Sequence, residues 1–328
     1  SLIVHASVVL PQLSAALRSA STQQLHIMPR GFPQKLSKGG VLSKEQPRAS
    51  LAVPMPPDAA GGSAAVRVQL YLSPAARLDS ALEALLQEPC GCFEQTSSTT
   101  YPLVMALQYF LVHPELASAL RSRARDILTR GYKHLVSFQT KSGGFEWFGD
   151  EPAHEALTAY GVLQFHDMRS AMPDLVDAGM LRRAFEWLFT RRAGDGGAHS
   201  AFLRSDRALD SFGHAPVVTT DAYIIYALVK AGHGSRLEPE IKILLAACDP
   251  LNFQDPYVLS LAAGSLFHLS QPEQATALAK RVAALQDPDG HVEGAKGSIT
   301  SSSGRALAIE ATAVSMLAWL DDPAKAFA

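Results

Sequence analysis

The sequence predicts a mainly α-helical protein whose helices form an α/α toroid, preceded by a small β-rich segment. Up to about residue 75, apolar residues alternate with period two in several short runs, which is typical of strands. From about Leu78 they recur at the spacing of a helix face, as at Leu82 and Leu85. The helical part also repeats itself weakly at roughly 50–60 residues, a period that indicates stacked helix pairs. We therefore expect two parts, residues 1–75 and residues 76–328.

Composition excludes several classes of protein. The chain has 328 residues, of which 47% are hydrophobic and 18% are charged, so it is too apolar to be disordered. A formal net charge of -2 with both signs mixed gives no basic footprint for nucleic acid. Since no apolar run approaches the ~20 residues of a membrane helix, we expect no membrane contact from this chain. It begins at Ser1 without a signal peptide, and we expect it to be a fragment of a longer protein.

The first part contains short alternating runs separated by clusters of Pro, Gly and Ser. In one run, Val66, Val68 and Leu70 alternate with more polar neighbours, as in a half-buried strand. We expect strands at residues 24–28, 49–53 and 65–72.

The second part contains helical segments separated by Pro and Gly residues, and several of these prolines stand at first-turn positions. We expect helices at residues 97–113, 115–139, 152–170, 174–193, 217–233, 237–247, 254–270, 272–286 and 305–321.

One helix type recurs in three similar copies, and Gly-rich turns precede them. The copies contain small and aromatic residues, which suit an inner ring of helices, and the more charged helices suit an outer ring. The copies are residues 157–163, 220–226 and 311–317. The Gly-rich turns are residues 138–145, 191–197 and 285–290.

The most informative motif lies where the helical part begins. Pro89 and Gly91 predict a turn before a helix that starts near Thr96. Such a turn can bring the Cys92 sulfur onto the side-chain carbonyl of Gln95, and loss of ammonia then leaves an internal thioester. Placing both groups in one turn supplies the effective concentration that this condensation needs.

The stretch Cys92-Phe93-Glu94-Gln95, flanked by Glu88-Pro89 and Thr96-Ser97-Ser98, resembles the thioester motif of the α2-macroglobulin and complement family. The flanks look like the bacterial α2-macroglobulin version in particular, and Gly91, Phe93 and Glu94 support the motif. Residues 25–31 also resemble the stretch that leads out of a macroglobulin-like domain. The resemblance therefore covers nearly the whole chain.

This resemblance implies a domain organisation. Residues 1–75 are expected to hold the end of a macroglobulin-like domain and the start of a CUB-like part. Residues 76–328 are expected to be an α/α-toroid thioester domain that lacks its last helix pair.

The resemblance also implies a function, that of a protease inhibitor with a single-use thioester rather than an enzyme. Cleavage of a bait region outside this chain exposes the thioester, and a lysine amine of the target protease attacks the Gln95 acyl carbon. The expected partners are target proteases and the other domains of the longer protein. The expected location is the periplasm or cell envelope, and no cofactor is implied. Four aromatic residues are either shields for the thioester or ordinary core: Tyr101, Trp147, Phe148 and Tyr160.

Some members of the family carry a histidine in a later loop that helps transfer to hydroxyls, as acid–base chemistry would suit. At the corresponding place this chain has Asp210, and His214 stands four residues later. If Asp210 is the equivalent, we expect amides with lysines in preference to esters.

The other cysteines leave alternatives open. Cys90 is either inert, or it attacks the thioester, or it pairs with Cys92 after hydrolysis. Cys248 lies at an apolar helix end and is expected to be core. Three cysteines form no disulfide framework, and neither the Cys90-x-Cys92 spacing nor the histidine spacing indicates a metal site.

Two enzyme classes are alternatives. Terpene cyclases and prenyltransferases also use α/α toroids, and residues 139–145 resemble their Gln-Gly-Trp repeat. The sequence lacks the acidic cluster of a cyclase, and Cys248-Asp249 has no obvious histidine partner for the zinc of a prenyltransferase. A cysteine hydrolase that uses Cys92 with His199 or His214 is a weaker option.

Overall fold

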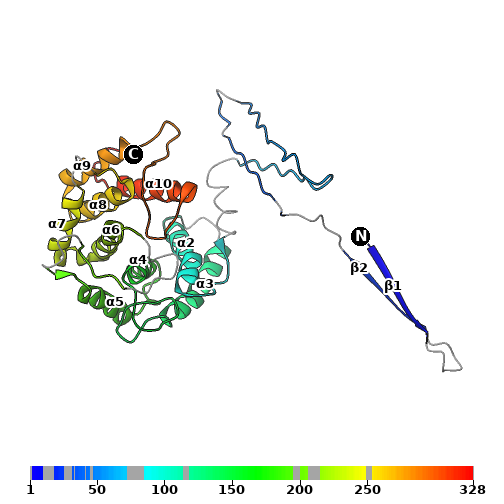
Figure 1. The fold of residues 1–328 in the computed structure, drawn as a ribbon, viewed down its shortest axis with the longest axis horizontal. Coiled ribbons are helices and arrows are strands. Elements are labelled where there is room, and N and C mark those ends of the chain that lie inside the picture. The colour runs from blue at the N-terminus through cyan, green and yellow to red at the C-terminus, as the bar shows by residue number, and fades with distance from the viewer. Residues whose placement is uncertain are drawn as a thin grey trace. The chain divides into compact units, whose positions relative to one another are not determined.

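The computed structural model describes residues 2–9, 18–25, 32, 34–40, 42–44, 47–71, 85–113, 118–194, 200–205, 215–248 and 253–327. The chain separates into two units, Ser1–Leu72 and Ser73–Ala328 (Figure 1). Each unit is described by itself.

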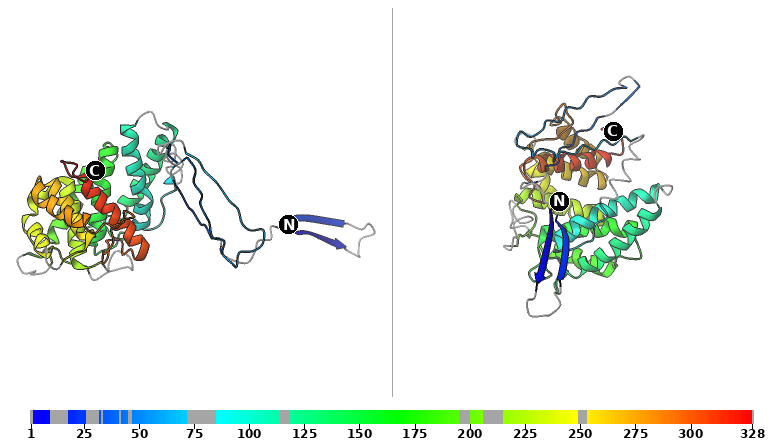
Figure 2. Two further views of the ribbon diagram at one scale, coloured as in Figure 1. Left: turned by 90° about the horizontal axis from the view of Figure 1, so that it is seen from above. Right: turned by 90° about the vertical axis from the view of Figure 1, so that its right-hand side faces the viewer.

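The first unit contains an antiparallel hairpin of strands β1 (Leu2–Val9) and β2 (Arg18–Leu25), which lie side by side in Figure 2. The pairing register sets Leu2 opposite Leu25. Of the strand expected at residues 24–28, the first two residues lie in β2, and the rest fall outside the described residues.

The prediction of strands at residues 49–53 and 65–72 is wrong, because residues 49–53 and the described residues 65–71 lack regular secondary structure. Val66 is 90% exposed and Leu70 is 82% exposed. A period-two pattern defines which face of a strand would be buried, but a strand is stable only when neighbouring strands and a packed layer complete it. The β-rich segment is therefore limited to the β1–β2 hairpin among the described residues.

The second unit is helical, and its helices agree with the expected segments to within a few residues. The helices are α2 (Phe93–Val112), α3 (Ser118–Val136), α4 (Glu155–Ala171), α5 (Ala178–Thr190), α6 (Val217–Leu228), α7 (Glu238–Ala247), α8 (Pro256–His268), α9 (Pro272–Ala283) and α10 (Gly304–Leu320). Helix α6 continues into a π-helical turn, η2 (Val229–His233), and a 3-10 turn, η3 (Gly234–Arg236).

The helices form two concentric layers (Figure 1). Helices α2, α4, α6, α8 and α10 each pack on the next and make up the inner layer, whereas α3, α5, α7 and α9 pack on the outside. Every residue of α6 from Thr219 to Leu228 is buried, as an inner helix requires. Outer helix α9 instead buries one stripe, consisting of Ala275, Leu278, Ala279 and Val282. This arrangement confirms the α/α toroid.

The two end helices of the inner layer expose apolar side chains. On α2 these include Leu111 and Val112, and on α10 they include Ile309 and Met316. The expected last helix pair would cover such surfaces, and its existence stays a prediction. None of the helices in the described ranges is long and apolar enough to cross a membrane.

The described residues that flank the three Gly-rich turns make the same contacts, which confirms the internal repeat. Each is closed by one isolated antiparallel bridge, namely Gln139 to Phe145, Arg192 to Phe202 and Gln286 to Val292. In each case a side chain of the following inner helix accepts a backbone N–H of the turn. The acceptors are Thr158 Oγ1 for Phe145 at 2.8 Å, Asp221 Oδ2 for Ala201 at 2.7 Å and Thr312 Oγ1 for Val292 at 2.9 Å. These acceptors occupy the same position in the three copies.

Candidate functional site

Helix α2 begins at Phe93, three residues before the expected start at Thr96, so Cys92 is its N-cap. Two contacts extend the helix. Gln95 Oε1 accepts the backbone N–H of Cys92 at 3.2 Å, and the Phe93 N–H donates to the Trp147 carbonyl at 2.9 Å. Both contacts satisfy backbone donors that a helix start otherwise leaves without partners. The thiol and the carboxamide of the motif therefore belong to the same first turn.

The Gly91 turn holds the Gln95 carboxamide against the backbone of the motif. Gly91 has φ +87°, and a Cβ atom there would stand 2.0 Å from Gln95 Oε1 and 3.0 Å from its Cδ. Glycine is required both for this backbone conformation and for the close approach. Cys92 is half-buried and Gln95 is exposed, so the structure brings the two predicted thioester residues together at the surface of this unit.

Phe93 anchors the motif in the core. Its side chain is fully buried, and its ring centroid lies 4.8 Å from that of Phe145 and 6.2 Å from that of Phe138. Gly161 of α4 makes room for it, because a Cβ atom there would lie 2.6 Å from Phe93 Cζ. The residue between Cys92 and Glu94 therefore fixes the start of α2.

Trp147 makes two hydrogen bonds to the motif. Its indole N–H donates to Glu94 Oε2 at 3.0 Å, and its carbonyl accepts the N–H of Phe93. Trp147 is 3% exposed, whereas its neighbour Phe148 is 65% exposed. The Glu146 carboxylate accepts the N–H of Phe148 at 2.7 Å and so shapes this turn. Of the four aromatic candidates, Trp147 is bonded to the motif itself.

Tyr101 and Tyr160 lie along the inner helices, with ring centroids 5.9 Å apart. Tyr101 is buried and donates to Asp167 Oδ2 at 2.7 Å. Burial raises the pKa of Tyr160 to about 12, and the negative charges of Glu310 and Glu94 act in the same direction. Tyr101 of α2 is thus bonded to α4, the helix to which Tyr160 belongs.

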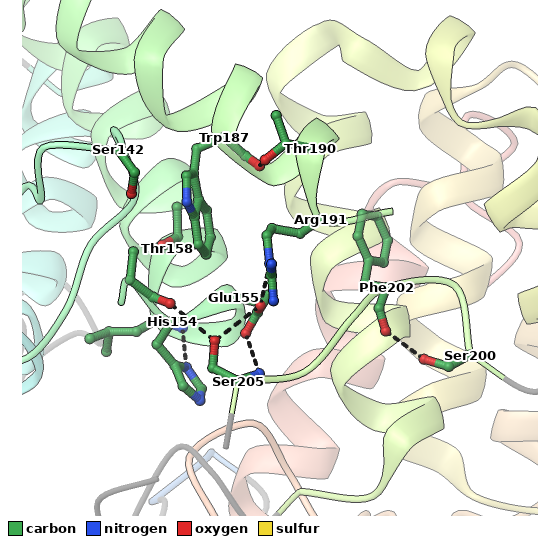
Figure 3. Close-up of polar contacts among 12 residues, drawn as sticks. Ser142, His154, Glu155, Thr158, Trp187, Thr190, Arg191, Ser200, Phe202 and Ser205 are labelled. Carbon is green, nitrogen blue, oxygen red and sulfur yellow. Dashed lines mark hydrogen bonds and ion pairs between the residues drawn. The ribbon is translucent and has the colours of Figure 1, made fainter. Parts of the chain in front are cut away.

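The start of the neighbouring helix α4 is a polar network (Figure 3). His154 is the N-cap, and its Nδ1 accepts the N–H of Leu157 at 3.3 Å. Burial lowers the pKa of His154, so the imidazole is kept neutral for this role. Glu155 is 2% exposed, pairs with Arg191 Nε at 2.7 Å and accepts the Ser205 N–H at 2.9 Å. This network ties α4 to α5 and to the following loop.

Several candidates cannot be placed. Asp210, His199 and His214 lie outside the described residues.

Cys248 is buried, and burial raises the pKa of its thiol to about 12, which confirms it as core. Cys90 is exposed. In the part of the chain that the structure describes, no cluster of His, Cys, Asp and Glu has the arrangement of a metal site.

Sequence reasoning missed the roles of His154, Glu155 and Gly161. None of these residues belongs to a local motif, and the partners of Glu155 lie 36 and 50 residues away. A usable signal existed only for the turn acceptors such as Asp221, which aligning the three copies would have placed at one shared position.

The comparisons with known proteins agree with this geometry. The family model of the A-macroglobulin TED domain matches residues 66–327. Alpha-2-macroglobulin-like protein 1 of Mus musculus is 24% identical over 157 residues, which are 46% of this chain and 10% of that protein. Thioester-containing protein 1 allele S3 of Anopheles gambiae is 26% identical over 115 residues, which are 35% of this chain and 8% of that protein. The chain thus spans a tenth or less of the length of these relatives.

A solved structure shares the fold. It is native alpha-2-macroglobulin from Escherichia coli, spanning domain MG7 to the C-terminus, with a TM-score of 0.50 and 16% identity. The match covers 74% of this chain and 38% of that one. Because the family model matches most of its length, the chain belongs to the A-macroglobulin TED domain family.

Proposed function

We propose that Cys92 and Gln95 form an internal thioester and that this chain is the reactive part of a covalent protease trap. One observation supports this most directly. The Gln95 carboxamide is folded back onto the Gly91 turn, with its oxygen 3.2 Å from the backbone nitrogen of Cys92. Placing the thiol and the carboxamide in one helical turn raises their effective concentration for a reaction that is otherwise unfavourable.

The chemistry consists of two acyl transfers. In the first, the Cys92 thiol attacks the Gln95 amide carbon, a C–S bond forms and ammonia leaves. In the second, a lysine amine of the target attacks the same carbon, and Cys92 leaves as a thiol that takes up the amine proton. The product is an amide between Gln95 and the target. Because nothing restores the thioester, the protein is an inhibitor that acts once rather than an enzyme.

A stored thioester has to be kept from water. Trp147 covers the Glu94 side of the motif, but Gln95 is exposed in this unit. We propose that other domains of the longer protein cover this exposed side until a protease cleaves the bait region. The periplasm or cell envelope is the proposed location, by analogy with bacterial α2-macroglobulins.

The trapping proposal is tested with a pair of matched proteases. The freshly prepared chain is mixed with an active serine protease and, separately, with the same protease after reductive dimethylation of its lysines. We expect an adduct that resists SDS with the first protease and none with the second, and the linked peptide should join residue 95 to a lysine. Equal adduct formation with both proteases would contradict attack by lysine amines.

The proposed equivalence of Asp210 to the family histidine is tested by product choice. The chain is offered equal amounts of Nα-acetyl-lysine amide and Nα-acetyl-serine amide. We expect the unmodified chain to form mainly the amide and Asp210→His to shift products toward the ester. An unchanged ratio in Asp210→His would reject the equivalence.

The alternative of a terpene cyclase or prenyltransferase is not supported by the family match, which covers the helical unit.

A further inference from the structure

Cys90 takes no part in the proposed thioester chemistry. It is exposed, and it lies two residues before the half-buried Cys92. A second thiol this close in sequence can react with the thioester or with the Cys92 thiol, so its role has to be explained.

The backbone between the two cysteines is sharply bent. The Thr96 hydroxyl lies 3.3 Å from the Cys90 carbonyl oxygen and 3.4 Å from the Gly91 carbonyl oxygen. Two successive carbonyl groups can meet one hydroxyl only if the chain turns between them, and Gly91 supplies this turn with its positive φ. Cys90 and Cys92 therefore lie on the two arms of one tight turn.

Both arms of the turn are fixed. Before it, Glu88 forms a two-pronged ion pair with Arg130, with distances of 2.6 and 3.1 Å, and Pro89 packs near Gly131 of α3. After it, the buried ring of Phe93 holds the start of α2. The backbone on both sides of the Cys90–Cys92 turn is thus held by the rest of the fold.

We propose that Cys90 and Cys92 form a disulfide once acyl transfer has released the Cys92 thiol. The release step rests on the proposed function. While the thioester is intact, the Cys92 sulfur is acylated and cannot pair. After transfer, both thiols are free on the same turn. The disulfide then marks a spent site and keeps the released thiol from further exchange.

The step needs an oxidant, which is a small-molecule disulfide or the disulfide of an oxidoreductase. The exposed Cys90 thiolate attacks one sulfur of this disulfide, forms a mixed disulfide and expels one thiolate. Cys92 then attacks the Cys90 sulfur, the Cys90–Cys92 bond forms and the second thiolate leaves. The two cysteines lose two electrons and two protons, and the external disulfide is reduced to two thiols.

The ring closed by a Cys-x-Cys disulfide is small. It gains little from loop closure, and strain makes it easily reduced. Labile, exposed disulfides of this kind are typical of regulatory pairs. The same bond, if formed before the thioester, blocks Cys92, so the ambient redox state also controls how much thioester can form.

The test separates this proposal from the thioester. Gln95→Ala cannot form the thioester, so it reports on the cysteine pair alone. It is equilibrated in buffers of increasing oxidised to reduced glutathione, quenched with acid, alkylated with N-ethylmaleimide and weighed as intact protein. We expect a species lighter by two hydrogens, with neither Cys90 nor Cys92 alkylated, and full reversal by excess reduced glutathione.

The matched control is Gln95→Ala with Cys90→Ser, in which we expect a glutathione adduct on Cys92 instead of the lighter species. Alkylation of both cysteines at every glutathione ratio, or separate glutathione adducts on each, would overturn the proposal. In the unmodified chain, methylamine uptake is measured first. If no uptake occurs and residue 95 is still an unmodified glutamine, while Gln95→Ala still closes the bond, the thioester fails and the pairing of the cysteines stands.

Discussion

The starts of α2 and α4 are neighbours in the inner layer, but they are built for different purposes. At α4, the cap His154 and the carboxylate of Glu155 are buried and bonded to backbone and side-chain partners. At α2, the cap Cys92 is half-buried and the carboxamide of Gln95 is exposed. The polar groups at the start of α4 are buried, whereas the carboxamide at the start of α2 is exposed to solvent.

This difference shows how the fold can carry a reactive turn without losing stability. The α2 start is anchored through Phe93 and Trp147, whose contacts involve the backbone and the residues between the reactive ones. The Gln95 carboxamide adds only one cap, to the Cys92 N–H, and the Cys92 side chain is half-buried. Substitutions should therefore separate into those that remove chemistry and those that remove stability.

The largest expected effect is that of Cys92→Ala on amine coupling. We expect methylamine uptake to fall to zero, because no acyl carrier remains. The free energy of unfolding should change by no more than about 1 kcal/mol, since the side chain is half-buried and its truncation leaves no large cavity. Intact mass and urea unfolding measure the two effects. Residual uptake at residue 95 would show that another group carries the acyl.

The next effect is that of Phe93→Ala on stability. Removing a fully buried ring should lower the free energy of unfolding by about 3–5 kcal/mol, since the aromatic cluster with Phe145 and Phe138 is left with a cavity. The matched control is Phe148→Ala, because Phe148 is 65% exposed and should cost no more than about 0.5 kcal/mol. Similar losses for both variants would contradict the anchoring role of Phe93.

A smaller loss is expected for Glu155→Ala. This substitution leaves the Arg191 guanidinium and the Ser205 N–H without their carboxylate partner. We expect the free energy of unfolding to fall by about 2–3 kcal/mol, and not by more, because Arg191 is partly exposed and can be rehydrated. Glu186→Ala breaks a surface pair with Arg236 and should cost about 0–1 kcal/mol. Chemical denaturation compares the two, and equal costs would show that burial of Glu155 is unimportant.

The smallest effect concerns pH. Burial holds the pKa of His154 below its ordinary value of 6.5; Glu155 partly opposes this, and Arg204 reinforces it. The unfolded chain therefore binds a proton more readily than the folded chain. The contribution of His154 is fully present above pH 6.5 and is lost as the pH falls below it.

His154→Asn keeps a capping side chain but does not titrate. Between about pH 5 and 6.5 we expect the dependence of unfolding free energy on pH to become shallower by at most about 1.4 kcal/mol per unit. The pKa values of His166 and His233 are also lowered by burial, so a slope should remain. A slope identical to that of the unmodified chain would show that His154 does not titrate with folding.

Much of the helical unit was predictable from sequence. Helical periodicity and the Pro and Gly residues between segments located α2 to α10, because a helix depends mainly on local spacing. The start of α2 was misplaced because its first donors are satisfied by a glutamine side chain and by Trp147, which is distant in sequence. The strands at residues 49–53 and 65–71 failed because a strand depends on neighbours that a local pattern does not specify.

The sequence predicted which residues form the candidate site but not the contacts that hold them in place. Cys92 and Gln95 were identified from a short motif, whereas the anchoring by Trp147 and the sealed network of Glu155 depend on contacts between distant segments. Asp210 was identified by position in a loop, and it stays a prediction.

The Cys92–Gln95 thioester is tested most directly by the intact mass of the freshly prepared chain before and after methylamine. We expect a mass lower than the sequence mass by one ammonia, stoichiometric addition of methylamine at residue 95, and one newly titratable thiol at Cys92. A chain that has already hydrolysed would carry Glu at position 95 and would support the same chemistry. A mass equal to the sequence mass, with Gln95 unmodified and no methylamine uptake, would contradict it.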